Sequence, residues 1–291
     1  MRKAAIDIGS NSIRLLVGDV ENGKVWVVAQ RLRTTRLGKT EKGGCLNPEA
    51  VARTLAALAE FREILADYGL DKKPVVAATS AVREAADGEQ FKKRIAEELG
   101  WELQVLSGEE EAQKSYLGAA AVAAAENSNV AVIDVGGGST ELIFSAADGA
   151  ISGRSVPVGA VRLHSGEVSR NDLPQVLSPL QKLYGGSGKA MTFVGVGGTI
   201  TSLAAMKRRL QVYCREEING VVLTKAELSA YYNELTALSA EEILKRYPLL
   251  KNREDIIADG IAIYLALFEM LDFTEIIVSD AGILDGLLLT T

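Results

Sequence analysis

The most informative part of the chain is the stretch Val132-Ile-Asp-Val-Gly-Gly-Gly-Ser-Thr-Glu-Leu-Ile-Phe144, because it has a counterpart near the start, Ala5-Ile-Asp-Ile-Gly-Ser-Asn-Ser-Ile-Arg-Leu-Leu-Val17. The two Asp residues are 127 positions apart (134 − 7 = 127), and the same offset aligns the glycine and serine positions that follow. Each copy is an apolar run ending in Asp, then a Gly/Ser turn, then a second apolar run, which predicts a β-hairpin with an open turn. Two copies predict two homologous lobes that face each other.

The rest of the chain alternates between patterns typical of strands and of helices, which predicts an α/β protein with mixed sheets. Asn47-Pro48 predicts a helix start, with Asn as the cap and Pro at the first helical position. Thr224-Lys-Ala-Glu227 and Ser239-Ala-Glu-Glu242 have the capping-box pattern and predict two further helix starts. A long helix is expected over roughly 254–271.

Composition excludes several classes of protein. The chain has 291 residues, enough for two domains, and a net charge of −6, which gives no general attraction to nucleic acid. The two cysteines, Cys45 and Cys214, are far apart, and His164 is the single histidine, so neither a disulfide framework nor a histidine-cluster metal site is expected. No apolar leader or run of membrane length is present, so we expect a cytoplasmic protein without a membrane partner.

The Gly-rich repeat has the chemistry of a phosphate site. Gly136, Gly137 and Gly138 leave backbone amides free to point at one anion, and Ser139 adds a hydroxyl. Asp134, at the strand end, can hold Mg²⁺ directly or through water. The alternative is a tight hairpin whose glycines serve turn geometry alone.

Two further loops resemble phosphate sites. In the first repeat Ser10 and Asn11 can donate to phosphate, and Asp7 is a second possible metal contact. The segment Gly197-Gly198-Thr199 lies at a strand-to-helix junction, where free amides and the helix dipole favour an anion. Turn geometry and close packing of a helix on a strand are the alternatives for these two loops.

Two charged positions remain ambiguous on their chemistry. In Ser107-Gly-Glu109-Glu110-Glu111, Glu110 has the spacing of a capping box, yet a glutamate beside a metal site could equally orient water as a general base. Arg83 lies one turn into a helix after a strand, where it could clamp phosphate or simply face solvent.

With these motifs in order, the chain resembles the exopolyphosphatase / guanosine pentaphosphate phosphohydrolase (Ppx/GppA) family of the actin-like ATPase superfamily. The resemblance runs nearly end to end and is carried by nine segments: Asp7–Leu15, Arg36–Gly38, Ala78–Arg83, Ser107–Ala112, Asp134–Glu141, Val156–Leu163, Gly197–Thr199, Arg253–Ile257 and Val278–Gly282. It implies two actin-like (ribonuclease-H-like) lobes, residues 1–119 and 120–291, with mixed sheets and the active site in the cleft between them. It also implies that the final helix, about 282–291, packs back on the first lobe and that the protein is a homodimer.

The resemblance further implies Mg²⁺-dependent release of terminal phosphate from inorganic polyphosphate, with Mn²⁺ as a substitute metal. In the family pattern Glu110 matches the proposed base, Arg83 a phosphate-binding arginine, and Asp134 and Glu141 the ends of the Gly-rich motif. Longer members carry a C-terminal helical region like that of HD phosphohydrolases, which this sequence lacks, so we expect short to medium chains as substrates.

The sequence therefore predicts an exopolyphosphatase with one catalytic carboxylate, two metal-binding carboxylates assisted by Asp7, and phosphate groups held by Ser10, Asn11, Arg83, Gly136, Gly137, Gly138, Ser139, Gly197, Gly198 and Thr199. A guanosine pentaphosphate 5′-phosphohydrolase uses the same chemistry and stays an alternative. A sensor that binds polyphosphate or nucleotide without hydrolysis, and an actin-like ATPase or sugar kinase, are alternatives from other classes.

Overall fold

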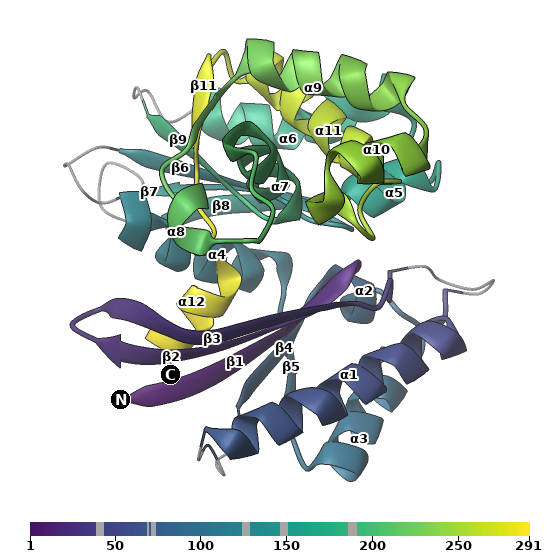
Figure 1. Ribbon diagram of the computed structural model, residues 1–291, viewed down its shortest axis with the longest axis vertical. Helices are drawn as coiled ribbons and strands as arrows, with labels where there is room; N and C mark the ends of the chain where they lie inside the picture. The colour runs from purple at the N-terminus through teal and green to yellow at the C-terminus, as the bar shows by residue number, and fades with distance from the viewer. Residues whose placement is uncertain (39–43, 69, 71–73, 124–128, 146–150, 186–190) are drawn as a thin grey trace. The chain divides into compact units, whose positions relative to one another are not determined.

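The computed structural model describes residues 1–38, 44–68, 70, 74–123, 129–145, 151–185 and 191–291. The chain divides into two compact units, one formed by Met1–Gly118 with Ile283–Thr291 and the other by Ala119–Gly282. Each unit contains one β-sheet with both parallel and antiparallel neighbours, covered by helices (Figure 1). The predicted fold class, α/β with mixed sheets, is confirmed.

The first unit is built on a sheet of order β3-β2-β1-β4-β5. β1 pairs antiparallel with β2 and parallel with β4, so the first hairpin stands next to a crossover strand. The elements of this part of the chain are β1 (Arg2–Ile8), β2 (Ser12–Glu21), β3 (Lys24–Thr34), α1 (Pro48–Asp67), β4 (Val75–Ala78), α2 (Ser80–Arg83), α3 (Gly88–Leu99), β5 (Leu103–Val105), α4 (Gly108–Ala123) and α12 (Ile283–Leu289).

Alternating side chains of β1 belong to two different cores in this unit. Ile6 and Ile8 pack with side chains of α1 and α3, among them Phe61 and Ile95. Ala5, the residue before Ile6, packs instead with residues of α12, because successive strand residues point to opposite faces. The C-terminal helix is therefore part of the first unit, on the face of the sheet opposite α1 and α3.

The second unit has a sheet of order β10-β11-β9-β6-β7-β8. Its hydrophobic core contains side chains of the sheet and of the helices that cover it. Tyr264 and Phe268 of α11 are among the fully buried side chains. Its elements are β6 (Val130–Val135), β7 (Thr140–Ser145), β8 (Ile151–Val156), α5 (Ala160–His164), η1 (Arg170–Asp172), α6 (Leu173–Gly185), β9 (Thr192–Val196), α7 (Gly198–Arg208), α8 (Arg215–Ile218), β10 (Val222–Thr224), α9 (Lys225–Ala237), α10 (Ala240–Arg246), η2 (Pro248–Leu250), α11 (Ile257–Met270) and β11 (Glu275–Val278).

The two sheets repeat one another strand for strand. Read from the other edge, β8-β7-β6-β9-β11 has the same order and the same directions as β3-β2-β1-β4-β5, and β10 is an added antiparallel edge strand. The two hairpins recognised in the sequence therefore occupy the same position in two equivalent sheets.

Helix starts follow the sequence signals closely. Asn47 accepts a hydrogen bond from the N–H of Ala50, and the capping boxes at Thr224 and Ser239 are both formed. The long helix begins at Ile257 rather than near 254, because residues 251–256 form turns before it. None of the helices in the described ranges is long and apolar enough to cross a membrane.

Candidate active site

The two repeated hairpins close in the same way. In the second unit the N–H of Gly136 donates to the carbonyl of Ser139 at 3.0 Å, and in the first unit the N–H of Gly9 donates to the carbonyl of Ser12 at 3.1 Å. Asp134 stands opposite Glu141 across the β6–β7 ladder, at the register position where Asp7 stands opposite Arg14. The repeat is therefore conserved between the two units down to single hydrogen bonds.

A second segment supports each turn from behind. Ala160 and Val161 donate their N–H groups to the carbonyls of Gly136 and Gly137, at 3.0 and 2.8 Å. A Cβ at Gly159 would lie 2.5 Å from the carbonyl carbon of Gly137, so only glycine fits there. The turn's carbonyls are thus used, whereas no hydrogen bond in the described part of the chain uses the N–H of Gly137 or Gly138. Free amides next to occupied carbonyls are available to donate to an anion.

The first unit repeats this support around Ser10 and Asn11. Gly38 donates its N–H to the Ser10 carbonyl at 2.8 Å, and a Cβ at Gly38 would lie 2.7 Å from Cβ of Ser10. The Asn11 carbonyl accepts from Thr35 and Arg36. The Ser10 hydroxyl is buried and lies 3.0 Å from the hydroxyl of Ser80, at the start of α2.

The third predicted loop lies against the second hairpin. Gly197 has φ 89°, and a Cβ there would be 2.7 Å from Oδ1 of Asp134, so the strand-end carboxylate and this loop are immediate neighbours. The helix that follows, α7, starts at Gly198 and is long enough to present a dipole at that end. The structure therefore brings together Asp134 and Gly197, two of the residues that the sequence analysis assigned to the site.

Arg253 lies against the third predicted loop, and the sequence analysis did not single it out as a candidate. A Cβ at Gly198 would lie 1.6 Å from Nη1 of Arg253, so the guanidinium rests directly on the glycine Cα. The turns that precede α11 hold it there, since the Arg253 N–H donates to Leu250 and the Ile256 and Ile257 N–H groups donate to the Arg253 carbonyl. The signal was present, because Arg253 opens one of the segments of the family resemblance, but its contact with a loop 55 positions earlier (253 − 198 = 55) is not local.

Tyr264 supports the same loop from inside the core. Its hydroxyl is fully buried and donates to the Val196 carbonyl at 3.0 Å. Burial raises the pKa of Tyr264 well above its ordinary value, and the charge of Asp134 acts in the same direction. The hydroxyl therefore stays a neutral donor that fixes the end of β9.

The carboxylates present fit a hydrated divalent cation. In the described residues no group of three or more His, Cys, Asp or Glu side chains is arranged to hold a metal. Asp134 and Glu141 are paired on the adjacent antiparallel strands β6 and β7, where the Cβ atoms of opposite residues are roughly 5 Å apart. In the first unit Oδ1 of Asp7 is buried without a hydrogen-bond partner. Mg²⁺ binds through one or two carboxylates and fills its shell with water and phosphate oxygens, so these side chains suit it.

Glu110 forms the capping box that was one of its two interpretations. Its carboxylate accepts the N–H of Ser107 at 2.8 Å, and its own N–H donates to the Ser107 hydroxyl at 3.2 Å. The backbone N–H and then the hydroxyl of Ser107 lower the pKa of Glu110. Glu110 is exposed and ionised at neutral pH, so it can accept a hydrogen bond from water.

Arg83 is held by its own unit. Its Nη1 donates to the Leu106 carbonyl at 2.7 Å and lies 3.2 Å from Oε2 of Glu111, whose side chain is buried. Guanidinium has five N–H donors, so these contacts orient Arg83 without using all of them. Glu111 is thereby committed to an ion pair, which separates its role from that of Glu110.

Comparison with known proteins identifies the family of the chain. A model of the Ppx/GppA phosphatase family matches residues 16–291. Exopolyphosphatase 2 of Mycobacterium tuberculosis is 31% identical, with 99% of this chain and 98% of that protein aligned. A guanosine-5′-triphosphate,3′-diphosphate pyrophosphatase of Aliivibrio fischeri is 29% identical over 98% of this chain and 58% of that protein.

Solved structures agree as well. The Aquifex aeolicus member of the Ppx/GppA family superposes with a TM-score of 0.79 at 31% identity, covering 100% of this chain and 97% of that one. An exopolyphosphatase from Cytophaga hutchinsonii superposes with a TM-score of 0.88 at 25% identity, again covering 100% and 97%. The resemblance seen in the sequence is confirmed, and so is the expected enzyme class of phosphoanhydride hydrolases: this chain belongs to the Ppx/GppA phosphatase family.

Proposed function

We propose that this protein is an exopolyphosphatase that removes orthophosphate from the ends of short to medium polyphosphate chains. The observation that carries the proposal is the pair of hairpins of identical register, each with an Asp at the strand end and a turn whose carbonyls are already bonded from behind. Each turn can direct amides and hydroxyls at phosphate oxygens.

The second unit supplies the groups nearest to the reacting phosphate in this proposal. Amides of Gly136, Gly137 and Gly138 and the hydroxyl of Ser139 hold the terminal phosphate. Gly197, Gly198 and Thr199 hold the next one at the start of α7, where the helix dipole favours negative charge. Arg253 adds a cation at Gly198, which the sequence reasoning had not included.

The first unit supplies a second phosphate contact and the groups that act on water. Ser10 and Asn11 hold a phosphate further along the chain, and Arg83 clamps it with the N–H donors that Leu106 and Glu111 leave free. Glu110 orients the attacking water in line with the bond to be broken. Its low pKa keeps it ionised over the neutral range, as a water-orienting carboxylate requires.

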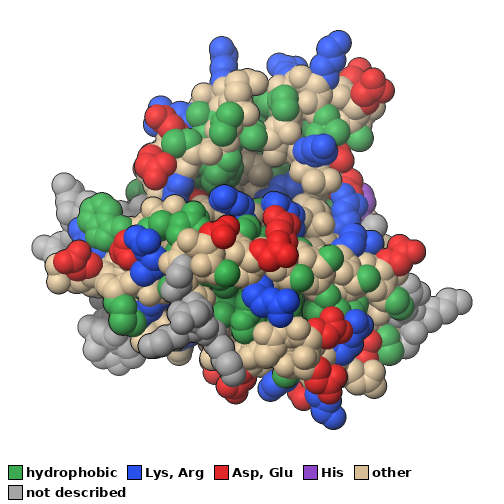
Figure 2. All heavy atoms as spheres, turned by 60° about the horizontal axis from the view of Figure 1, so that its bottom comes forward, with side chains coloured by type: hydrophobic (Ala, Val, Ile, Leu, Met, Phe, Trp, Pro, Cys, Tyr) green, Lys and Arg blue, Asp and Glu red, His purple; other side chains and the backbone are tan. Residues whose placement is uncertain are grey.

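Asp134 and Glu141, with Asp7 as a further ligand, would hold Mg²⁺ or Mn²⁺, whose chemistry is to offset negative charge on the transferred phosphoryl group. The remaining local charges are too few to attract a polyanion by themselves. Acidic and basic side chains are intermixed over the face drawn in Figure 2, and the net charge is −6. Affinity for polyphosphate must therefore come from the loops and the metal.

We also propose that the enzyme works in the cytoplasm as a homodimer, without a nucleic-acid or membrane partner. The acidic net charge supports the absence of nucleic acid, because a polyanion is not attracted to such a surface. Family resemblance supports the dimer.

The test is phosphate release in Mg²⁺ from short polyphosphate, long polyphosphate, ATP and guanosine 5′-triphosphate 3′-diphosphate, side by side. We expect the highest kcat/KM on short polyphosphate. The Asp134→Asn variant should release no phosphate. A higher kcat/KM on the guanosine compound would assign the alternative substrate, which relatives such as the Aliivibrio fischeri enzyme favour. Stoichiometric binding of polyphosphate without phosphate release would instead establish a sensor.

A further inference from the structure

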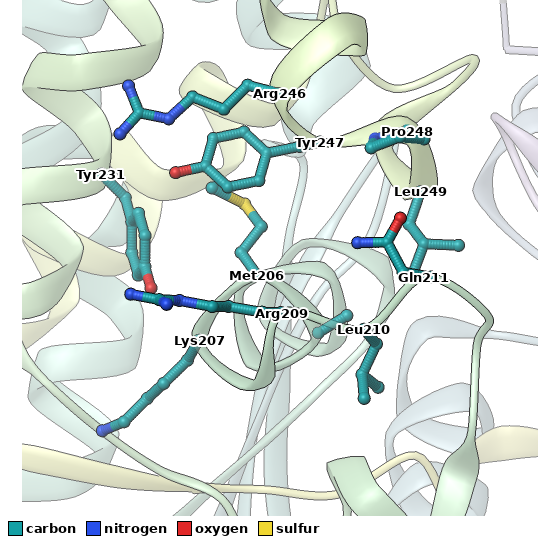
Figure 3. Close-up of a pocket in the computed structure, with 11 residues that line it drawn as sticks. Met206, Lys207, Arg209, Leu210, Gln211, Tyr231, Arg246, Tyr247, Pro248 and Leu249 are labelled. Atoms are coloured by element: carbon teal, nitrogen blue, oxygen red, sulfur yellow. The ribbon is translucent and has the colours of Figure 1, made fainter.

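A cavity in the second unit lies apart from the phosphate loops. It has a volume of about 450 Å³ and is formed between the C-terminal end of α7, the helix α9 and the segment from α10 to η2 (Figure 3). α7 runs for 11 residues from Gly198 to Arg208, so its two ends are roughly 16 Å apart. The cavity at one end is thus a separate site from the Gly-rich loop at the other.

The lining combines aromatic and apolar surface with cations. Tyr231 and Tyr247 are both half-buried, and Met206, Leu210 and Leu249 complete an apolar wall. Figure 3 shows the guanidinium of Arg209 reaching toward Tyr231, with Tyr247 above Met206. Three lining residues are basic and none is acidic: Lys207, Arg209 and Arg246.

Two of the three cations already form ion pairs with glutamate side chains. Lys207 pairs with Glu227 at 2.6 Å. Arg246 pairs with Glu234 at 3.0 Å, and Glu234 also accepts the Tyr247 hydroxyl at 2.8 Å. Burial, then the hydrogen bond to Glu234, raises the pKa of Tyr247 to about 12, so the phenol stays neutral.

Arg209 is the cation left over. Within the described ranges its guanidinium forms no hydrogen bond or ion pair with another side chain or carbonyl. Its backbone is left-handed, with φ 55°, at the C-terminal cap of α7, a position where glycine is usual. A strained backbone that carries an unused guanidinium into a cavity is a reason to look for a ligand.

We propose that this cavity binds a mononucleotide-like molecule, with its aromatic ring against Tyr231 and Tyr247 and its anionic group on Arg209. The volume matches a ligand of that size, since small-molecule sites are commonly about 300–1,000 Å³. Half-buried tyrosine faces stack on planar rings, and arginine donates in pairs to phosphate. The proposal does not depend on the hydrolytic function, because it concerns a different set of residues.

The test is binding of AMP and GMP to the full chain, measured by calorimetry. Neither probe contains a phosphoanhydride bond, so hydrolysis cannot alter the titration. Adenosine alone and inorganic phosphate alone are the comparison ligands, and each is expected to bind more weakly than the nucleotide, because it uses only half of the site.

The decisive variant is Arg209→Gly. It removes the guanidinium and places glycine where the backbone is left-handed, so the melting temperature should be equal or higher while nucleotide affinity falls at least about tenfold. Arg208→Ala is the matched control, since Arg208 is also basic and exposed but does not line the cavity. The proposal is overturned if neither nucleotide binds at millimolar concentration, if Arg209→Gly binds as tightly as the wild type, or if Arg208→Ala loses as much affinity.

Discussion

Arg14 and Glu141 occupy the same position in two hairpins of the same register, and they carry opposite charges. Arg14 neutralises Asp7, with 2.7 Å between Nη2 and Oδ2. Glu141 instead places a second carboxylate opposite Asp134; it is buried and accepts a hydrogen bond from the Ser155 hydroxyl at 2.6 Å. Like charges facing each other across a ladder are unfavourable unless a cation lies between them. The hypothesis that a cation binds at the second hairpin therefore predicts a larger effect of changes at Glu141 than at Arg14.

Glu141→Gln should weaken the metal site while leaving the fold intact, because the amide oxygen can still accept from Ser155. We expect the Mg²⁺ concentration for half-maximal activity to rise by roughly tenfold or more. Mn²⁺ binding without substrate, followed by electron paramagnetic resonance, is the second measurement. Unaltered Mn²⁺ affinity in the variant would remove Glu141 from the metal site, whatever its effect on turnover.

Arg14→Gln should act mainly on stability. The variant leaves the Asp7 carboxylate, with 6% of its side chain exposed, without its cation. Breaking a buried pair in this way costs roughly 3 kcal/mol of unfolding free energy, measured by urea titration. Arg2→Gln is the matched control, because the Arg2–Asp19 pair at 2.9 Å is about 40% exposed on both sides and solvent screens it, so its loss should lower the unfolding free energy much less. Equal losses in the two variants would contradict the assignment.

The sequence was sufficient where the determining contacts are local. The repeated hairpins follow from an apolar run, an Asp and a Gly/Ser turn, and the helix starts at Asn47, Thr224 and Ser239 follow from residues within three positions of each cap. Such patterns involve the backbone of a few neighbours, so they are visible without a fold.

The sequence was insufficient where distant segments meet. The glycines behind the two turns, Gly38 and Gly159, are needed because another segment approaches within a side-chain radius. Arg253 reaches Gly198 only after the turns before α11 have formed, which is also why that helix starts later than its apolar pattern suggested. Glu110 illustrates both situations: its capping box is local and was predicted, whereas the catalytic role proposed for it would depend on groups distant in sequence.

Gly198→Ala tests the contact with Arg253. The new methyl group would overlap the guanidinium, which is the flexible end of a side chain and can swing away. We therefore expect a small change in melting temperature but a rise in KM for polyphosphate of roughly tenfold, because a phosphate contact is displaced. Gly185→Ala is the control, since open space surrounds that position at the end of α6. A KM that stays at the wild-type value would exclude the Gly198–Arg253 contact from substrate binding.

Glu110→Gln tests the water-orienting carboxylate. The amide oxygen can still accept the Ser107 N–H, so the start of α4 should be preserved and the melting temperature should hardly change. Loss of a general base typically lowers kcat by roughly 10²–10⁴-fold. Glu109→Gln removes the same charge one residue earlier, from an exposed side chain, and should retain most activity. If both variants kept normal turnover, the base would have to be another group.

Ser107→Ala tests whether the helix cap at Ser107 affects the pH dependence of kcat. The backbone N–H and then the hydroxyl of Ser107 lower the pKa of Glu110, with a smaller contribution from the charge of Lys114, and alanine keeps the N–H. Removing the hydroxyl raises that pKa part of the way toward its ordinary value of 4.5. The acidic limb of the kcat–pH profile should therefore move to higher pH. Stability conferred by an ionised, depressed carboxylate is present above its unfolded pKa and lost as pH falls through the folded one, so the variant's deficit should be largest near neutrality.

A Ser→Ala substitution in a second capping box separates the effect on stability from the effect on the kcat–pH profile. Ser239 and Glu242 at the start of α10 repeat the geometry, with the hydroxyl and backbone N–H of Ser239 lowering the pKa of Glu242. Ser107→Ala and Ser239→Ala should each lose about 1 kcal/mol of unfolding free energy at neutral pH, because each deletes one helix cap. Only Ser107→Ala should also displace the acidic limb, because Glu242 has no part in the reaction. A displaced limb in both variants, or in neither, would show that the limb reports a group other than Glu110.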